Sequence, residues 1–476
     1  MSEILSAKLD GRAPLRAAER LGVEPVGKLL LKFSIPAVAG MLLNALYNVV
    51  DRVFVGQGVH ELALGGLSLV LPLQTLSMAF AMLFGIGAAS MISIRLGQGR
   101  REEAENALNH CLWLLAIVGA LIMVAELVWL EPILRSLGAQ EGSASIDYAR
   151  TYYRIILVGH IFFMVSFGLS HCTRAQGFPM ISMVGMIIGA GLNMVLDPIF
   201  IFGLHWGVEG AAFATIISQF ASTLWMLYFN TGNRGVIRLR LASLRPSLKI
   251  ILEIMSFGSS QFLLQFAMSS VQLLLNTSMG WYGAATLRVA NGGDIAISGM
   301  NIVGTVSMLI LMPVFGLNQG AQPVLGFNYG AKKFARVRKA YLLSVLAATV
   351  ICTFGFLLAE IFPRFIVSVF VSNGSAALVA WTEWSLRVSA IFLALNGFQI
   401  VSTNMFVFTG RIKISIFLSM SRQVIFLVPA ILILGRFFGA YGAVASIPVA
   451  DGLALVVTAI MIYFELKKLN AQSAVL

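Results

Sequence analysis

Long apolar runs recur along the whole chain of 476 residues, and they restrict its fold more than any other feature. A helix of roughly 20 apolar residues crosses the hydrocarbon core of a bilayer, where only helices and closed barrels satisfy every backbone polar group. The chain is 58% hydrophobic and 11% charged, whereas soluble domains carry about 25% charged residues. The sequence therefore predicts an all-α integral membrane protein with twelve transmembrane helices. We place them at 33–56, 64–92, 106–129, 149–171, 178–203, 209–229, 252–280, 296–326, 340–362, 381–408, 414–435 and 441–464.

The formal net charge of +12 could also indicate a nucleic-acid binder. The Lys and Arg residues nevertheless gather in alternate connections, for example at Arg95 to Arg101 and again at Lys332 to Lys339. Such one-sided placement follows the positive-inside rule, which puts both termini in the cytoplasm and requires an even number of spans. We therefore expect a multi-pass membrane protein that contacts membrane lipid and binds no nucleic acid.

The two halves of the sequence resemble each other at a nearly constant offset of 231 to 233 residues. Three glycine pairs mark this repeat: Gly99 with Gly330, Gly177 with Gly410, and Gly207 with Gly439. Each half holds six predicted spans, an even number, so both halves cross the membrane in the same direction. The sequence predicts two six-helix bundles related by a parallel pseudo-two-fold repeat, an arrangement that secondary transporters use.

The repeat and the basic connections predict the division of the chain. We expect a cytoplasmic N-terminal segment (1–32), an N-terminal six-helix bundle (33–232), a cytoplasmic basic linker (233–250), a C-terminal six-helix bundle (251–468) and a cytoplasmic tail (469–476). Within the first segment, Arg16 and Arg20 at helical spacing indicate either a short basic helix on the membrane surface or a disordered tail.

Polar residues interrupt the first apolar run on one helical face. Asn44, Asn48 and Asp51 stand at positions i, i+4 and i+7, with Tyr47 beside them. A polar stripe on an otherwise apolar helix is expected to face the interior of the bundle. We interpret Asn44, Tyr47 and Asn48 as residues that line a cavity for substrate.

The fifth run, "GLNMVLDPIF", places Asn193 and Asp197 on one face and follows them with Pro198. A charged residue at the centre of a membrane helix costs about 2.5 to 3.5 kcal/mol on insertion scales, and such residues are usually functional. Pro198 removes a backbone donor and frees the carbonyl of Met194, which a helix tolerates where it lines a cavity. Asp51 and Asp197 are either hydrogen-bonded structural groups or, as we favour, a site for protons or for a small cation.

The carboxyl-terminal half offers neutral polar groups instead, which suit contact with substrate: Gln261, Gln265, Asn396 and Gln399. We assign no role in transport to the other ionisable groups in the apolar runs. We expect Glu126 and Asp294 at the outer interface and Glu383 paired with Arg387, and we expect His160 and His171 at helix edges in solvated or capping roles.

Asp451 is a further polar contact in the last run. The three cysteines are widely separated, show no disulfide or metal spacing, and are interpreted as packing residues. No GxxxxGK[ST] sequence occurs, which disfavours an ATP-driven pump encoded in this chain. We expect neither enzymatic activity nor a cofactor.

Several long stretches of this sequence resemble the multidrug and toxic compound extrusion (MATE) family, in particular its bacterial branch with DinF-like and MepA-like members. The resemblance extends from about Lys28 to Lys468. It rests on "SIPAVAGMLLNALYNVVDRVFVGQ", "GQGRREEAENAL", "RAQGFPMISMVGMIIGAGLNMVLDPIFIFG", "GVEGAAFATIISQ" and "MPVFGLNQGAQPVLGFNYGAKK".

The resemblance implies two bundles around a V-shaped cleft that opens alternately to the two sides of a bacterial cytoplasmic membrane. It implies export of amphipathic, often cationic, drugs in exchange for protons or sodium. The ion-coupling residues that it implies are Asp51, Asn193, Asp197 and Thr215, which would also be the ligands of sodium if sodium is the coupling ion. Another branch of the family uses an acid in the seventh span, where this chain has Gln265.

Two other functions stay open beside the exporter. A lipid-linked glycan flippase of the same superfamily would line its cavity with several Arg or Lys for the pyrophosphate. A membrane receptor would bind a ligand without any ion-driven flux. We expect a monomer that exports organic cations or amphipathic drugs, and the sequence leaves open whether protons or sodium ions drive it.

Overall fold

The structure, a computed structural model, describes residues 13–58, 61–136, 144–240, 246–289, 291–371 and 375–475. These residues are almost entirely helical and include no strand. The N-terminal half contains α2 (Ala13–Val23), α3 (Val26–Gly58), α4 (Glu61–Gly97), α5 (Arg101–Val128), α6 (Leu130–Ser136), α7 (Ala144–Ala175), α8 (Pro179–Pro198), the π-helix η1 (Ile199–Gly203) and α9 (Gly207–Thr231). The C-terminal half contains α10 (Leu248–Thr286), α11 (Gly292–Gly330), α12 (Phe334–Ile361), α13 (Pro363–Phe370), α14 (Ala376–Ala390), α15 (Leu393–Phe408), α16 (Ile412–Met420), the π-helix η3 (Ser421–Leu427) and α17 (Val428–Val475).

Twelve membrane spans can be counted in the described part of the chain. Ten helical segments are long and apolar enough to cross a membrane, and α14 and α15, bent by 50° at their junction, form one more. The segment Ile412–Ser473 has 62 residues, about 93 Å of helix, which is about three times the hydrocarbon thickness. Its helix breaks at Gly439, where φ is 61° and ψ is −140°, so this segment supplies two spans. The predicted fold class is confirmed.

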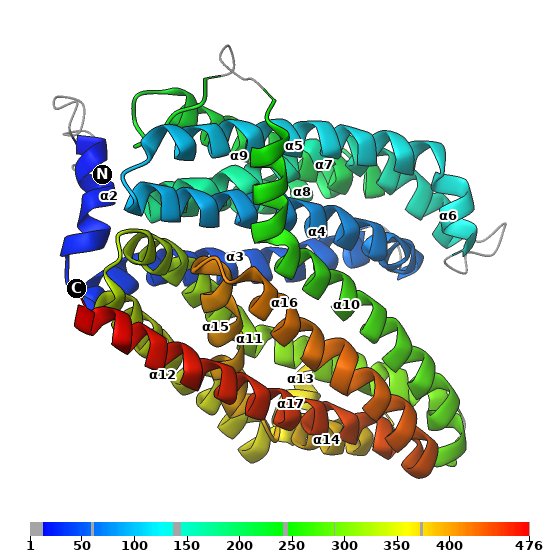
Figure 1. Cartoon of the computed structure of the whole chain (residues 1–476). Helices are drawn as coiled ribbons and strands as arrows, with labels where there is room; N and C mark the ends of the chain where they lie inside the picture. The colour runs from blue at the N-terminus through cyan, green and yellow to red at the C-terminus, as the bar shows by residue number, and fades with distance from the viewer. Residues whose placement is uncertain are drawn as a thin grey trace.

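The helices form two lobes, an N lobe of α3 to α9 and a C lobe of α10 to α17 (Figure 1). Figure 1 shows that the lobes lie together near the two chain ends and diverge toward the opposite end of the molecule. The described N-terminal and C-terminal residues lie at the same end, as an even number of spans requires. We call this the terminal end and the other the distal end.

The sequence repeat appears as repeated backbone geometry. Gly177 after α7 and Gly410 after α15 both have positive φ, and the next residue in each half donates its N–H to the carbonyl five residues back. Gly207 and Gly439 also both have positive φ. Glycine adopts this left-handed region without the strain that a Cβ atom introduces.

The structure corrects the register of the repeat after the second and eighth spans. The sequence alignment pairs Gly99 with Gly330, but the residue whose positive φ corresponds to that of Gly99 is Lys332. Gly330 instead corresponds to Gly97, because each of these two glycines packs against a backbone carbonyl of the other lobe, Gly97 on Phe327 and Gly330 on Ile94. The repeat is therefore offset by two more residues here than the glycine spacing alone indicates.

Glycines let the two lobes approach closely in the half of each helix near the terminal end. On one side of the pseudo-two-fold axis, Gly316 and Gly320 of α11 pack on the backbones of Val38 and Ser34 of α3. On the other side α4 and α10 make the equivalent contact, where Gly87 and Gly258 meet backbone carbonyls of the opposite lobe. Small residues permit this backbone approach between membrane helices. We call these two contacts the glycine seam.

Helix α2 closes the terminal end further, because its carboxyl end is held by the C lobe. Arg336 of α12 donates to the carbonyl oxygens of Leu21 (3.1 Å) and Glu24 (2.6 Å), and Lys333 donates to that of Gly22 (2.8 Å). Cationic side chains commonly satisfy the free carbonyls at the end of a helix. Residues 13–23 of the predicted N-terminal segment are therefore helical and packed on the C lobe.

Candidate functional site

A cavity of about 740 Å³ lies in the N lobe and reaches the C lobe at its rim. Helices α3, α4, α7, α8 and α9 form most of its wall, and α10 and α11 contribute Gln265, Met308 and Gln319. Its wall includes polar residues from every one of these N-lobe helices, among them Asp51, Ser77, His160, Asn193 and Thr215. A cavity of this volume matches the usual size of small-molecule sites.

Asn193 of α8 and Thr215 of α9 line this cavity, and Asp197, one turn after Asn193 on α8, contacts Asn193. All three side chains are buried, and that of Asp197 has no exposed surface. With its amide oxygen turned toward α9, Asn193 donates from Nδ2 to Asp197 Oδ2 (2.7 Å) and accepts from Thr215 N (3.2 Å) and Thr215 Oγ1 (3.3 Å). The structure thus places these three predicted residues in one group.

Asp51 joins this group from the first span. Its carboxyl group is in hydrogen-bonding contact with that of Asp197, and Tyr47 and Tyr152 contact the hydroxyl of Thr215 beside them. Two carboxyl groups in direct contact cannot both carry a charge in a buried site, so the pair holds a proton between them unless a cation neutralises it. The carboxyl pair therefore joins α3 and α8 in the interior of the N lobe.

The helix that carries Asp197 changes its winding directly after the site. Helix α8 ends at Pro198, and the π-helix η1 follows, in which Leu204 N donates to Ile199 O (2.9 Å). Pro198 cannot donate to the carbonyl one turn earlier, and the wider turn accommodates the chain after this loss. The break predicted from Pro198 therefore takes the form of a π-helical turn beside Asp197.

The remaining predicted cavity residues divide into two groups. Asn44, Tyr47 and Gln265 line the cavity, whereas the side chain of Asn48 lies outside the described residues. In the C lobe, away from this cavity, Gln261 donates to Asn404 Oδ1 (2.8 Å). Asn396 and Gln399 are buried there in α15, so these three side chains are separated from the carboxyl pair.

The interior of the C lobe contains an ion pair as well as neutral amides. Arg422 of η3 donates to Asp451 Oδ1 of α17 (2.7 Å), and Asn396 donates to Asp451 Oδ2 (3.1 Å). The sequence reasoning named Asp451 but overlooked Arg422. A signal was present, because Arg422 stands alone in the predicted span 414–435 and a lone intramembrane arginine requires a partner.

Two assignments of ionisable groups from sequence are wrong. His160 and His171 were expected in solvated or capping roles at helix edges, but their exposed fractions are 4% and 2%. Glu126, which was expected at the outer interface, lies near the end of α5 and is buried there. His160 and His171 line the cavity, and Glu126 lies behind His160. The side chains of His160 and His171 point inward because α7 turns this face toward the cavity, and the sequence alone does not specify that rotation. The predicted pairing of Glu383 with Arg387 is confirmed at 3.6 Å, and Asp294, which is predicted at the outer interface, is exposed.

The cavity carries charges of opposite sign at its two ends. Toward the terminal end lies Arg174, a buried guanidinium that donates to Ser170 Oγ (3.0 Å) and to Ser182 Oγ. It is the one Lys or Arg in the cavity wall that the described residues form. The sequence reasoning counted Arg174 among the basic residues of the connections, and its burial is a correction. The described wall of the cavity therefore combines one carboxyl group, that of Asp51, and one buried cation with neutral polar and apolar residues.

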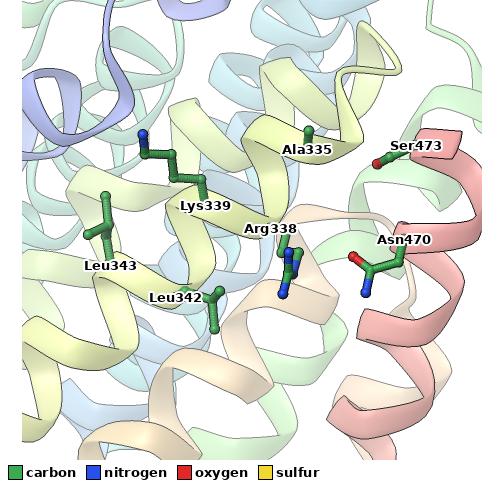
Figure 2. Close-up of a pocket in the computed structure, with 7 residues that line it drawn as sticks. All are labelled: Ala335, Arg338, Lys339, Leu342, Leu343, Asn470 and Ser473. Atoms are coloured by element: carbon green, nitrogen blue, oxygen red, sulfur yellow. The ribbon is translucent and has the colours of Figure 1, made fainter.

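A second hollow, of about 520 Å³, lies at the terminal end between α12 and α17. Figure 2 shows Arg338 and Asn470 facing one another across it, with Lys339 directed away and Leu342 and Leu343 on the helix below. Among the described residues, those that line this hollow include two basic side chains, Arg338 and Lys339, and no Asp or Glu.

The chemistry of the carboxyl site suits a proton or a small hard cation. The described residues contain no group of three or more His, Cys, Asp or Glu side chains that could bind a transition metal. The oxygens of Asp51, Asn193, Asp197 and Thr215 are hard donors of the kind that bind hard cations. The same oxygens fit either a shared proton or sodium.

Comparison with known proteins gives one consistent result. The sequence model of the MatE family matches residues 36–199 and 262–432, which is well over half of the chain. The multidrug export protein MepA of Staphylococcus aureus (strain NCTC 8325 / PS 47) is 27% identical over 454 residues, covering 94% of this chain and 96% of MepA. MepA of Staphylococcus saprophyticus is 26% identical over 449 residues, with the same coverage.

Solved structures agree in fold. An outward-facing conformation of a multidrug resistance MATE family transporter of the MOP superfamily superimposes with a TM-score of 0.86 at 26% identity, covering 95% of this chain and 98% of that chain. A MOP superfamily transporter from Pyrococcus furiosus, described as having a binding pocket of reverse polarity, gives 0.87 at 26% identity with the same coverage. A MATE structure in the bent conformation gives 0.87 at 27% identity, covering 96% of this chain and 99% of that chain.

Proposed function

Because the chain belongs to the MatE family, we propose that it is a secondary active exporter of amphipathic, often cationic, small molecules. In this proposal protons or sodium ions flow inward and drive drugs outward by alternating access of the two lobes. Relatives of nearly the same length that are named multidrug export proteins support the export function. The coupling mechanism is argued from the site described above.

The contact between Asp51 and Asp197 is the observation that carries the proposal. These carboxyl groups come from two spans and contact one another beside a drug-sized cavity, whose wall includes Asp51. Binding of a proton or sodium removes the repulsion between them, and loss of that ion leaves a negative site that attracts an organic cation. The inward-moving ion and the exported cation therefore compete for the same negative charge, which is the requirement for antiport.

The arrangement of the lobes supports alternating access. The glycine seam and α2 hold the lobes together at the terminal end, while the lobes diverge toward the distal end (Figure 1). With both termini in the cytoplasm, as the charge distribution predicts, this conformation faces outward. Export then requires the seam to separate and the distal ends to approach, with each lobe moving as one body.

The same proposal covers the organisation of the chain in the cell. We assign residues 33–232 and 251–468 to the two bundles, and we place the protein as a monomer in a bacterial cytoplasmic membrane. The segments 1–32, 233–250 and 469–476 would be cytoplasmic. The described wall of the cavity contains one Lys or Arg. A glycan flippase would use several for a pyrophosphate, so this wall favours the exporter.

Efflux of a fluorescent cation tests the proposal. Cells that produce the Asp197→Asn variant should retain ethidium, whereas the Asp294→Asn variant should export it like the wild type. Asp294 is a suitable control because it is exposed in the first turn of α11, away from the cavity. Wild-type efflux by Asp197→Asn would refute the role of the carboxyl pair. Absence of any efflux by the wild-type protein would favour the receptor.

Proteoliposomes identify the coupling ion. A proton gradient and a sodium gradient are imposed in separate experiments. Purified protein should export ethidium under one of them, and that gradient identifies the coupling ion. If export is equally fast when neither gradient is imposed, ion-driven antiport is refuted.

A further inference from the structure

A second buried acid lies behind the cavity wall, apart from the carboxyl pair. Glu126 of α5 and His160 of α7 are each 4% exposed, and Glu126 Oε2 lies 3.4 Å from His160 Nδ1. Tyr153, also of α7, donates its hydroxyl to Glu126 Oε2 (3.1 Å). Ser77 Oγ of α4 lies 3.1 Å from His160 Nδ1. Three helices therefore converge on one carboxyl group and one imidazole ring.

The surroundings of this pair make a bare carboxylate costly. Glu126 Oε1 is buried without a hydrogen-bond partner. The carboxyl group is therefore stabilised through Oε2 alone, by Tyr153 and His160. A carboxylate in an apolar interior is unfavourable unless hydrogen bonds and a cation compensate its charge. A proton held between Glu126 and His160 makes the pair neutral overall, whether it resides as an ion pair or as two neutral groups.

The pair is open to exchange with the cavity. The imidazole of His160 and the hydroxyl of Ser77 both line the cavity, whereas Glu126 does not. A proton can therefore leave through the ring into the cavity without exposing the carboxyl group. Its loss leaves one negative charge on Glu126, and an organic cation in the cavity compensates that charge.

Other titratable groups around the pair are few and identifiable. Tyr153 contacts Glu126 directly, and α4 contributes the nonionisable Ser77. Nearer the distal end of α7, Arg150 is bound to Glu131 of α6 and to Asp147, so that cluster is already paired. The cavity wall also includes Asp51 and Tyr47 of α3, and on α7 itself it includes Tyr152, His171 and Arg174. Asp197 of α8 is in contact with Asp51.

We propose that Glu126 and His160 form a second proton-binding site, which gives up its proton to the cavity when an organic cation binds. The site rests on the proposed export of cations, but it does not require that Asp51 and Asp197 bind protons. It implies that a bound cation displaces one proton from this site in addition to the ion displaced from the carboxyl pair.

Calorimetry of the purified full-length protein tests the site. Binding of tetraphenylphosphonium, a cation without a titratable group, is measured in buffers of different ionisation enthalpy, which yields the number of protons released. The His160→Gln and Glu126→Gln variants should each release one proton fewer than the wild type. The matched control is His110→Gln, since His110 is a buried histidine of α5 that lies outside the cavity wall, and its variant should release as many protons as the wild type.

Wild-type proton release by both His160→Gln and Glu126→Gln would overturn the proposal. If these variants do not fold, the Asp51→Asn/Asp197→Asn double variant provides the test. Binding of the cation should still displace one proton from this variant. Absence of proton release would overturn the proposal. Transport is measured separately in proteoliposomes. Proton displacement without ethidium efflux would refute the export function and leave the site standing, whereas efflux without the extra proton would refute the site alone.

Discussion

Adding one methyl group to the glycine seam should shift the balance between the two arrangements of the lobes. In Gly320→Ala the new Cβ atom would lie 2.6 Å from Ser34 Cα and 2.6 Å from Ser34 N, whereas ordinary contacts begin at 3.4 Å. The backbones of α3 and α11 must therefore separate by about 0.8 Å. Both atoms belong to a helix backbone, so no flexible side chain can yield instead.

The expected magnitude follows from the cost of overpacking. Forcing an extra carbon into a packed contact costs about 1 to 3 kcal/mol. This cost applies only while the seam is closed, so it shifts the equilibrium toward the separated arrangement by roughly 5- to 150-fold. We expect export to slow as well, because the exporter must close the seam once in every cycle.

Distances between spin labels measure the shift. Labels at the exposed positions Arg101 in the N lobe and Lys413 in the C lobe, in a protein lacking its three cysteines, should report a larger separated fraction in Gly320→Ala. The control is Gly304→Ala in the same helix, where a Cβ atom would meet nothing within 4 Å. Both substitutions raise helix propensity equally. Identical distance distributions for the two variants would refute the role of the seam.

Three further outcomes can be checked on purified protein. Arg336→Gln should lower the free energy of unfolding by about 1 to 3 kcal/mol, because two charged hydrogen bonds to the end of α2 are lost, and a thermal melt unchanged from wild type would contradict this. Arg150 holds the pKa of Glu131 below its usual range, so this contact stabilises the fold above the unfolded-state pKa of Glu131 and loses its effect as pH falls. The melting temperature of Arg150→Gln should therefore fall below that of wild type at neutral pH and converge with it in acid; a constant difference would refute the contact. Arg422→Gln should destabilise the C lobe by about 3 to 5 kcal/mol, since it leaves Asp451 buried without its cation, and Arg422→Gln/Asp451→Asn should recover part of the loss. No recovery in denaturation of the double variant would contradict the pairing.

The membrane class, the twelve spans and the two-lobe repeat could all be predicted from the sequence. These features depend on the length and spacing of apolar runs, which the chemistry of the bilayer translates directly into helices. The helical period also placed Asn193 and Asp197 on one face, and their group with Thr215 was implied by family resemblance. Local chemistry and resemblance were sufficient there because the residues lie one turn apart or in adjacent spans.

The contacts between distant spans required the folded structure. A helical period tells which residues share a face, but it leaves open how far each helix rotates and which neighbour that face meets. The contact of Glu126 with His160 and that of Arg422 with Asp451 both depend on such rotation. The sequence therefore predicted neither contact. The register of the repeat was also settled by packing, because Gly97 and Gly330 are equivalent through the carbonyls that they touch in the opposite lobe. Sequence spacing describes one helix at a time, whereas burial and charge pairing are properties of several helices packed together.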